Sequence, residues 1–169
     1  MAHLAYVSLG SNVGDREKNL RSAIQALRLI GRVRSISSFY ETEPVEFTKQ
    51  PEFLNCVVAL ETPSTPAHLL HQLLDIEKAM GRQRIQKKGP RTIDLDVVLF
   101  GDVAINTPEV IIPHPAMHQR RFVLEPLAEI APEARHPILK KTVGELLKQL
   151  PEGQSVRRIE ANSNVGRRS

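Results

Sequence analysis

The order of helical and extended patterns along this chain limits its fold more than any other feature. Four stretches are rich in alternating apolar or β-forming residues, and two others repeat apolar residues with the 3.6-residue period of a helix. In chain order they read strand, helix, strand, strand, helix, strand: 4–9, 20–30, 33–42, 53–61, 66–80 and 93–99. We therefore predict an α+β fold with a ferredoxin-like βαββαβ core. Two helices cover one face of its antiparallel sheet, and the other face is free to carry a site.

The rest of the chain adds short elements to this core. An apolar run at 110–112 leads into a Pro-His-Pro turn at 113–115, and helical patterns follow at 122–130 and 142–150. We expect a single domain over residues 1–160 and a flexible basic tail over residues 161–169. Four arginines in or near this tail are interpreted as part of a solvated end: Arg157, Arg158, Arg167 and Arg168.

Composition bounds the class of protein. A length of 169 residues, 41% hydrophobic and 25% charged, suits one globular domain, and a net charge of +4 favours an anionic partner. The single cysteine, Cys56, cannot form an intrachain disulfide, which fits a reducing compartment. Because we find neither a secretory signal pattern nor a membrane-length apolar run, we expect a cytoplasmic protein with no membrane partner.

Two aspartates occupy alternate positions of the last predicted strand. Asp94 and Asp96 share one face, with β-carbons about 6.6 Å apart, opposite a core face made of Ile93, Leu95, Val97 and Leu99. At an effective dielectric of about 20 the two charges would repel by about 2 to 3 kcal/mol. A solvated strand face is the alternative, but the apolar flanks and Arg91 favour Mg²⁺, which proteins hold with one or two carboxylates and substrate phosphates.

A basic segment directly precedes these aspartates. Residues 81–91 begin with a glycine, have another at position 89, and hold five cations: Arg82, Arg84, Lys87, Lys88 and Arg91. This pattern favours a phosphate-binding segment that closes over its ligand, although a flexible loop kept soluble by its charges is the alternative.

The glycine-containing turn at 10–14 follows a strand and precedes a helix, as phosphate-binding loops do. It lacks the Gly-Lys-Ser/Thr ending and the GxGxxG spacing of such loops. We therefore predict an ordinary strand-to-helix turn, with Ser11, Asn12 or Asp15 capping the helix.

Other candidate ligand contacts lie on the strand 53–61 and after the Pro-His-Pro turn. Phe53 and Asn55 share one strand face, which indicates a platform for a flat heterocycle with a polar edge, with core packing as the alternative. His114 is fixed between two prolines and Arg120 follows it, so we predict a phosphate or metal-shell contact, with a structural turn histidine as the alternative.

Many of these residues lie in motifs of one known family. Over about the first 130 residues, the chain resembles the 6-hydroxymethyl-7,8-dihydropterin pyrophosphokinase (HPPK) family of folate biosynthesis. Gly-Pro-Arg-Thr-Ile-Asp-Leu-Asp at 89–96 is the most specific match, and the others are Leu-Gly-Ser-Asn at 9–12, Ser-Phe-Tyr-Glu-Thr at 38–42, Pro51 with Phe-Leu-Asn at 53–55, Glu77 with Gly-Arg at 81–82, and Pro-His-Pro at 113–115 with Arg120 and Phe122.

The resemblance implies a ferredoxin-like fold and transfer of diphosphate from ATP to the hydroxymethyl group of the pterin, releasing AMP. It implies two Mg²⁺ ions on Asp94 and Asp96, with Arg82 and Arg91 completing the catalytic set. It implies ATP contacts at Glu77, Arg84, Lys87, Arg91, Val97, His114 and Arg120. It implies pterin contacts at Thr42, Glu43, Val45, Phe53, Asn55 and Phe122. The expected partners are the two small-molecule substrates, ATP and 6-hydroxymethyl-7,8-dihydropterin. We expect the protein to be a monomer.

Two other classes of function compete with this one. Ferredoxin-like sheets with aromatic faces and basic loops also bind RNA, but a carboxylate pair on the sheet would repel nucleic-acid phosphates. A metal-dependent phosphohydrolase would share the aspartates without needing the Phe53 and Asn55 platform. We therefore expect no nucleic-acid partner.

Overall fold

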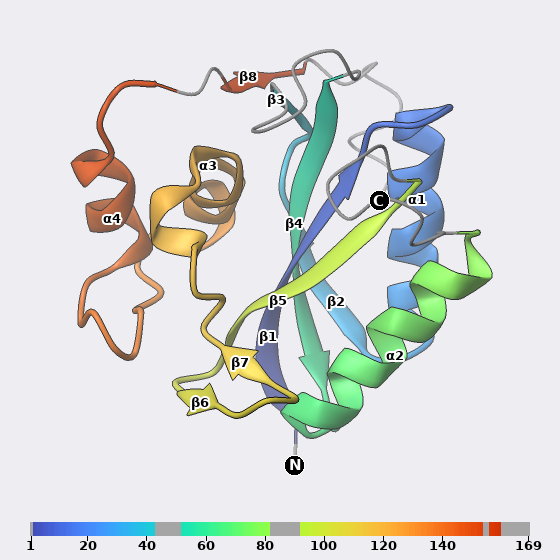
Figure 1. Cartoon of the computed structure of the whole chain (residues 1–169), viewed down its shortest axis with the longest axis horizontal. Coiled ribbons are helices and arrows are strands. Elements are labelled where there is room, and N and C mark those ends of the chain that lie inside the picture. Colours follow the sequence, from blue (N-terminus) through green and yellow to red (C-terminus); the bar gives the residue numbers. More distant parts are fainter. Residues whose placement is uncertain (1, 43–51, 82–91, 154–155, 160–169) are drawn as a thin grey trace.

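The computed structural model describes residues 2–42, 52–81, 92–153 and 156–159 (Figure 1). Its elements in chain order are β1 His3–Ser11, α1 Arg16–Leu27, β2 Arg32–Ile36, β3 Tyr40–Thr42, β4 Phe53–Thr62, α2 Pro66–Ala79, β5 Asp94–Phe100, β6 Ile105–Asn106, β7 Ile111–Ile112, the 3-10 turn η1 Met117–Gln119, α3 Arg121–Ile130, α4 Val143–Gln149 and β8 Val156–Arg158.

The main sheet runs in the order β5-β1-β4-β3-β8, and every pair in it is antiparallel. β2 pairs with the same strand, β4, that pairs with β3. The first and last core strands therefore lie side by side as β1 and β5, while β4 supplies the other neighbour of β1. This is the predicted ferredoxin-like α+β core, and the prediction is confirmed.

α1 and α2 cover one face of the sheet, as the sequence pattern predicted (Figure 1). Asp15 caps α1 by accepting a hydrogen bond of 3.1 Å from the Lys18 backbone N–H, which confirms one of the three predicted caps. Thr65 caps α2 in the same way, and Gly81 follows that helix with a φ of +87°, a conformation that favours glycine. The two helices bury their apolar stripes against alternate residues of β1, β4 and β5, among them Val7, Leu9, Cys56, Leu95 and Val97.

The opposite face of the sheet is only partly free, which corrects the expectation of an uncovered face. α3 and α4 pack over the half that carries Val57 and Val98, and they build a second apolar core there (Figure 1). Leu99 belongs to this second core and not to the helix-covered face that its alternation predicted. The reason is an irregularity in the pairing of β1 with β5 between Tyr6 and Val7, since an extra residue in one strand reverses the side-chain alternation beyond it.

The C-terminal arginines correct a second expectation. Arg157 and Arg158 lie in β8, which extends the sheet beside β3, and are not part of a disordered end. Arg157 pairs with Glu41, Arg158 lies 3.5 Å from Glu129, and Ile159 packs against the main core. An open strand edge and two carboxylates together stabilise this short strand.

Two further properties follow from the described residues. Cys56 is buried as a free thiol, as predicted, and burial raises its pKa. Within the described ranges, no helix is both long and apolar enough to cross a bilayer.

Candidate active site

The predicted metal and pterin residues meet in one row across the sheet. Gly10 of β1 pairs with Asp94 of β5 on one side and with Asn55 of β4 on the other. Paired residues in adjacent strands share a face, so Asp94 and Asn55 lie two strand spacings apart, about 9.6 Å. Asp96 occupies the next same-face position of β5, opposite Ser8. The two aspartates are half-buried, and their oxygen atoms are the donors that Mg²⁺ prefers.

Asn55 is held in a fixed orientation beside Gly10. The residue is 4% exposed, and its Nδ2 donates a hydrogen bond of 2.7 Å to Oγ1 of the buried Thr42. Its Oδ1 lies where a side chain on Gly10 would begin, since a Cβ there would be 2.8 Å from Oδ1 and 3.6 Å from Cδ1 of Phe53. The glycine therefore lets the asparagine and the phenylalanine lie over the centre of the sheet.

Glu77, a predicted ATP contact, links α2 to the aspartate strand. The residue is 3% exposed, and its Oε2 accepts a hydrogen bond of 2.7 Å from the Leu95 backbone N–H. Because β5 is an edge strand of the sheet, this contact satisfies a backbone donor between Asp94 and Asp96. Glu77 thus fixes the strand that carries both aspartates.

His114 lies close enough to Arg120 and Asp94 for both charges to act on it. His114 donates its backbone N–H to the Val98 carbonyl at 3.1 Å, and its Nδ1 accepts from the Ala116 N–H at 3.1 Å. Burial and the charge of Arg120 lower the pKa of His114, while the charge of Asp94 opposes them. The imidazole is therefore neutral near pH 7, with its proton on Nε2, and it is a hydrogen-bond donor at that atom.

Arg120 precedes α3, and its guanidinium carbon lies 5.5 Å from the centre of the Phe122 ring. This distance is within the range of a cation–π contact. The ring itself is half-buried against the second core. Arg120 and Phe122 are thus placed as one unit at the start of α3.

The remaining predicted site residues divide into two groups. The Val97 side chain lies in the helix-covered core, on the face opposite Asp94 and Asp96, which leaves its backbone for any ATP contact. The others lie outside the described residues: Glu43, Val45, Arg82, Arg84, Lys87 and Arg91. Within the described ranges, no group of three or more His, Cys, Asp or Glu side chains is arranged to hold a metal.

Sequence reasoning missed two clusters of charged residues that border the site. Arg16 bonds to Glu41 and to the Glu52 carbonyl. Glu129 of α3 accepts hydrogen bonds from the Ser38 N–H, the Ser38 hydroxyl and the Tyr40 hydroxyl at 2.8 to 2.9 Å. The motif at 38–42 marked the region, but nothing in the sequence paired these residues across 25 to 91 positions.

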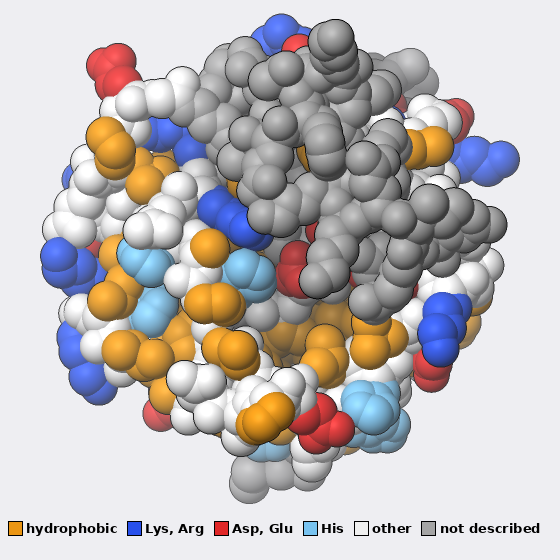
Figure 2. All heavy atoms as spheres, in the orientation of Figure 1, with side chains coloured by type: hydrophobic (Ala, Val, Ile, Leu, Met, Phe, Trp, Pro, Cys, Tyr) orange, Lys and Arg blue, Asp and Glu red, His pale blue; other side chains and the backbone are white. Residues whose placement is uncertain are grey.

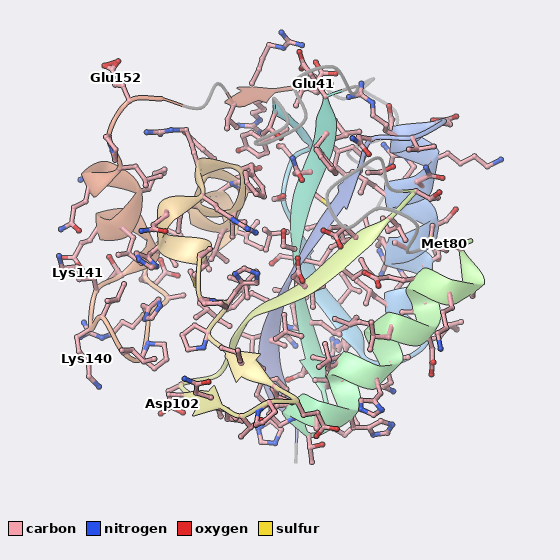
Figure 3. All side chains as sticks on the ribbon, in the orientation of Figure 1. Glu41, Met80, Asp102, Lys140, Lys141 and Glu152 are labelled. Atoms are coloured by element: carbon pink, nitrogen blue, oxygen red, sulfur yellow. The ribbon has the colours of Figure 1, made fainter. Side chains whose placement is uncertain are left out.

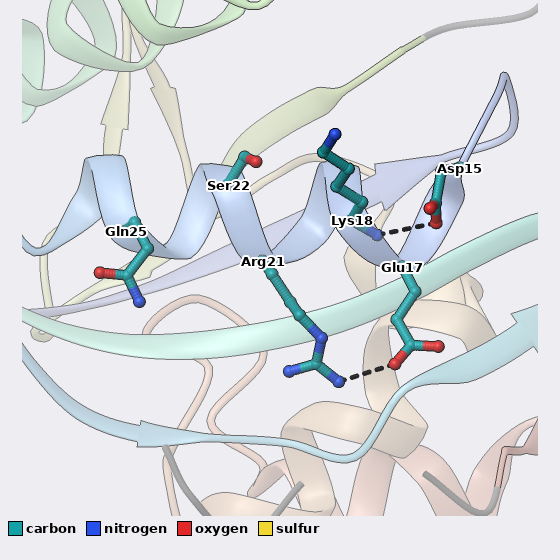
Figure 4. Close-up of a pocket in the computed structure, with 6 residues that line it drawn as sticks. All are labelled: Asp15, Glu17, Lys18, Arg21, Ser22 and Gln25. Carbon is teal, nitrogen blue, oxygen red and sulfur yellow. Dashed lines mark hydrogen bonds and ion pairs between the residues drawn. The ribbon is translucent and has the colours of Figure 1, made fainter. Parts of the chain in front are cut away.

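A separate pocket of about 400 Å³ lies along α1 (Figure 4). It contains none of the predicted site residues. Asp15 serves there as the helix cap, and Arg21 pairs with Glu17 at 2.8 Å. Asp15, Glu17 and Arg21 therefore have local helix-stabilising roles, and the predicted metal and pterin residues lie on the sheet face instead.

On the face in Figure 2 the Lys and Arg side chains of the described residues lie singly or in small groups, most of them toward the rim, and they form no continuous stripe on the described part of that face. A nucleic-acid-binding face usually concentrates such charges.

Comparison with known proteins identifies the family. The family profile of 7,8-dihydro-6-hydroxymethylpterin-pyrophosphokinase (HPPK) matches residues 6–132. The 2-amino-4-hydroxy-6-hydroxymethyldihydropteridine pyrophosphokinase of Bacillus subtilis is 47% identical over 132 residues, which cover 77% of this chain and 79% of that protein. The chain belongs to the HPPK family. The HPPK family uses ATP as a co-substrate, and the predicted pyrophosphokinase activity in folate biosynthesis is confirmed at this level, whereas the RNA-binding and phosphohydrolase alternatives find no support.

Some HPPK relatives are much longer than this chain. The folic acid synthesis protein fol1 of Schizosaccharomyces pombe is 41% identical over 150 residues, which are 88% of this chain but only 20% of that protein. A solved HPPK-DHPS structure of Plasmodium falciparum with STZ-DHP has a TM-score of 0.72 at 15% identity, covering 88% of this chain and 45% of that one. At that identity the likeness supports the fold.

Proposed function

We propose that the HPPK reaction of this chain takes place on the sheet face around Gly10. The chain transfers diphosphate from ATP to the hydroxymethyl oxygen of 6-hydroxymethyl-7,8-dihydropterin and releases AMP. The observation that carries this placement is the row Asp94, Gly10, Asn55, because it sets a carboxylate for metal and phosphate two strands from an amide suited to a heterocycle edge. The distance of about 9.6 Å leaves room for the hydroxymethyl group and the transferred phosphates between them.

The metal side of the site consists of Asp94 and Asp96. We propose that they hold two Mg²⁺ ions together with phosphate oxygens of ATP, since two carboxylates on one strand face match this donor set. Mg²⁺ held by these carboxylates would supply positive charge that offsets the phosphates, so that a neutral hydroxyl could approach the β-phosphorus. Positive charge on the phosphates is proposed to come also from Arg82 and Arg91, with Arg84 and Lys87. Glu77 stabilises β5 through its hydrogen bond with the Leu95 N–H.

The pterin side of the site consists of Phe53, Asn55 and Phe122. We propose that the two rings stack on the pterin and that Oδ1 of Asn55 accepts from an N–H on its edge. The amide is preoriented by its bond to Thr42, so little ordering entropy is lost when the pterin binds. Backbone groups from Thr42 through Glu43 to Val45 are proposed as further partners of the polar edge.

His114 and Arg120 are proposed to contact the ATP phosphates. The neutral His114 ring offers an Nε2–H donor, which suits a phosphate oxygen and does not suit direct metal coordination. Arg120 supplies a permanent cation beside it. The proposed hydrogen bonds from both residues become stronger as negative charge shifts toward the departing AMP oxygen.

Incubation of the protein with Mg²⁺, ATP and 6-hydroxymethyl-7,8-dihydropterin tests the proposal. We expect AMP to form only when the pterin is present. Asp96→Asn and Asn55→Ala should each depress this rate, and the exposed His68→Ala serves as the control that should not. Formation of ADP or free phosphate, or an unchanged rate in both site variants, would refute the placement.

We also propose that the chain acts as a cytoplasmic monomer with one catalytic domain over residues 1–160. The buried, reduced Cys56 is compatible with a reducing compartment. Sedimentation at working concentrations tests the oligomeric state, and a dimer would contradict it.

A further inference from the structure

One guanidinium joins the two chain segments that flank residues 43–51. Arg16, the first residue of α1, donates from Nη1 to the Glu52 carbonyl at 2.8 Å and from Nη2 to Glu41 Oε2 at 2.6 Å. Glu41 directly precedes Thr42, and Glu52 directly precedes Phe53. The link therefore ends one residue before each of two proposed pterin contacts.

The position of Arg16 is electrostatically unfavourable without these partners. A helix N-terminus carries partial positive charge, so a cation in the first turn is disfavoured. The Glu41 carboxylate offsets this, and the Arg16 hydrogen bond is the largest effect that lowers the pKa of Glu41. The two side chains are only 29% and 13% exposed, so solvent screens the pair less than it screens a surface pair.

A second arginine holds Glu41 from the other side. Arg157 of β8 contacts Glu41 Oε1, and the Ile159 N–H donates to the Phe39 carbonyl at 2.8 Å. Figure 3 shows Glu41 at the end of the sheet where β3 and β8 lie side by side. Glu41 is thus fixed by α1 and by the C-terminal strand together.

The strand geometry connects this link to the pterin face. Glu41 pairs with Leu54 on the helix-covered face, whereas Thr42 pairs with Phe53 on the opposite face. The hydrogen bonds of Arg16 on the helix-covered face therefore fix the backbone positions of Thr42 and Phe53, whose side chains project from the opposite face. Through Thr42 Oγ1 it also fixes the Asn55 amide.

We propose that Arg16 is a positioning residue for the pterin, acting through Glu41 and the Glu52 carbonyl without touching either substrate. This inference rests on the proposed placement of the pterin over Phe53 and Asn55. We expect it to be specific to one substrate, because among the described residues the Arg16 guanidinium hydrogen-bonds to the segments before Thr42 and Phe53, and not to β5 or the segment around His114.

Arg16→Met tests the proposal by removing both hydrogen bonds while keeping a long side chain. With Mg²⁺ and a non-hydrolysable ATP analogue present, we expect the Kd for the pterin to rise about tenfold, the effect of about 1.4 kcal/mol. The Kd for the analogue and kcat at saturating pterin should change by no more than about twofold. Arg16→Lys retains one charged donor in place of the two-pronged guanidinium, so it should recover part of the pterin affinity.

The matched control is Arg34→Met. Arg34 pairs at 3.7 Å with Glu61, near the far end of the same strand β4, so this variant loses an arginine–glutamate pair away from the site. It should leave both Kd values unchanged. Thermal unfolding of each variant separates a local shift of the strands from general destabilisation.

Glu41→Gln and the double variant Arg16→Met/Glu41→Gln complete the test. If both residues act through one link, the double variant should bind the pterin about as weakly as Arg16→Met alone. Effects of the two substitutions that multiply, or an equal loss of ATP-analogue and pterin binding, would overturn the inference.

Asn55→Ala distinguishes this inference from the site placement on which it rests. If Asn55→Ala weakens pterin binding and Arg16→Met does not, the positioning role is wrong and the placement stands. If neither variant changes pterin binding, both are wrong.

Discussion

Replacement of Gly10 by alanine should weaken pterin binding while the chain still folds. The added Cβ would lie 2.8 Å from Asn55 Oδ1, and ordinary contacts begin at 3.4 Å, so this oxygen must retreat by the difference of 0.6 Å. Gly10 is not among the glycines with positive φ, so alanine meets no backbone strain of its own. The substitution therefore acts through the Asn55 side chain.

The structure sets the size of this effect. Movement of the amide stretches its hydrogen bond to Thr42 Oγ1, which is 2.7 Å long and joins two residues that are at most 4% exposed. Weakening of a buried hydrogen bond costs about 1 to 3 kcal/mol, which should appear in the free energy of unfolding. Displacement of the amide that contacts the pterin edge should raise the Kd for the pterin about 10- to 100-fold.

Urea unfolding and equilibrium binding of the pterin measure the two quantities separately. Gly153→Ala is the matched control, because none of the described residues lies within 4 Å of a Cβ at that position. It should leave the Kd unchanged and alter stability by no more than about 1 kcal/mol. An unchanged Kd for the pterin in Gly10→Ala would refute the idea that Asn55, which lies beside this glycine, contacts the pterin edge.

Three other substitutions test separate parts of the structure. Asp96→Asn should lower kcat about 100-fold or more with folding intact, measured as AMP release over a range of Mg²⁺ concentrations, and a rate within about twofold of wild type would exclude a metal role. Glu77→Ala leaves the Leu95 N–H without its carboxylate partner, so the free energy of unfolding in urea should fall by about 2 kcal/mol, and no change would show that this contact is dispensable. Glu41→Gln should flatten the acid side of the stability curve. The hydrogen bond and charge of Arg16 lower the pKa of Glu41 below its ordinary value of 4.5. The charged form therefore stabilises the fold at pH values above 4.5, and this contribution is lost as the pH falls through the lowered pKa. Thermal unfolding from neutral to acid pH should show a steeper decline for the wild type than for this variant, and parallel curves would contradict it.

The elements that local chemistry controls were predictable. α1 and α2 follow from their apolar spacing, α1 together with its cap at Asp15, and β4 follows from its alternation. These signals lie within a few residues of each other, which is the range that propensity and capping cover. The pairing of Asp94 with Asp96 on one strand face was predictable for the same reason.

Features that depend on distant pairing were not predictable in this way. The sequence of β8 has the pattern of a polar tail, because Glu41 and Glu129, which pair with its arginines, are distant in the chain. The bulge that turns Leu99 to the second core depends on how β5 pairs with β1. The packing of α3 and α4 over half of the second face was missed, because the sequence of each helix shows an apolar stripe but does not show which surface that stripe packs against.

The sequence by itself determined the family, the order of the core elements and the residue types of the site. Specific motifs such as Gly-Pro-Arg-Thr-Ile-Asp-Leu-Asp and short-range periodicity encode these directly. Only the tertiary structure decided that Asp94, Gly10 and Asn55 form one row, and that Arg16 joins the segments before Thr42 and Phe53. Strand register and long-range ion pairs set these contacts, and both arise from the packing of the whole chain.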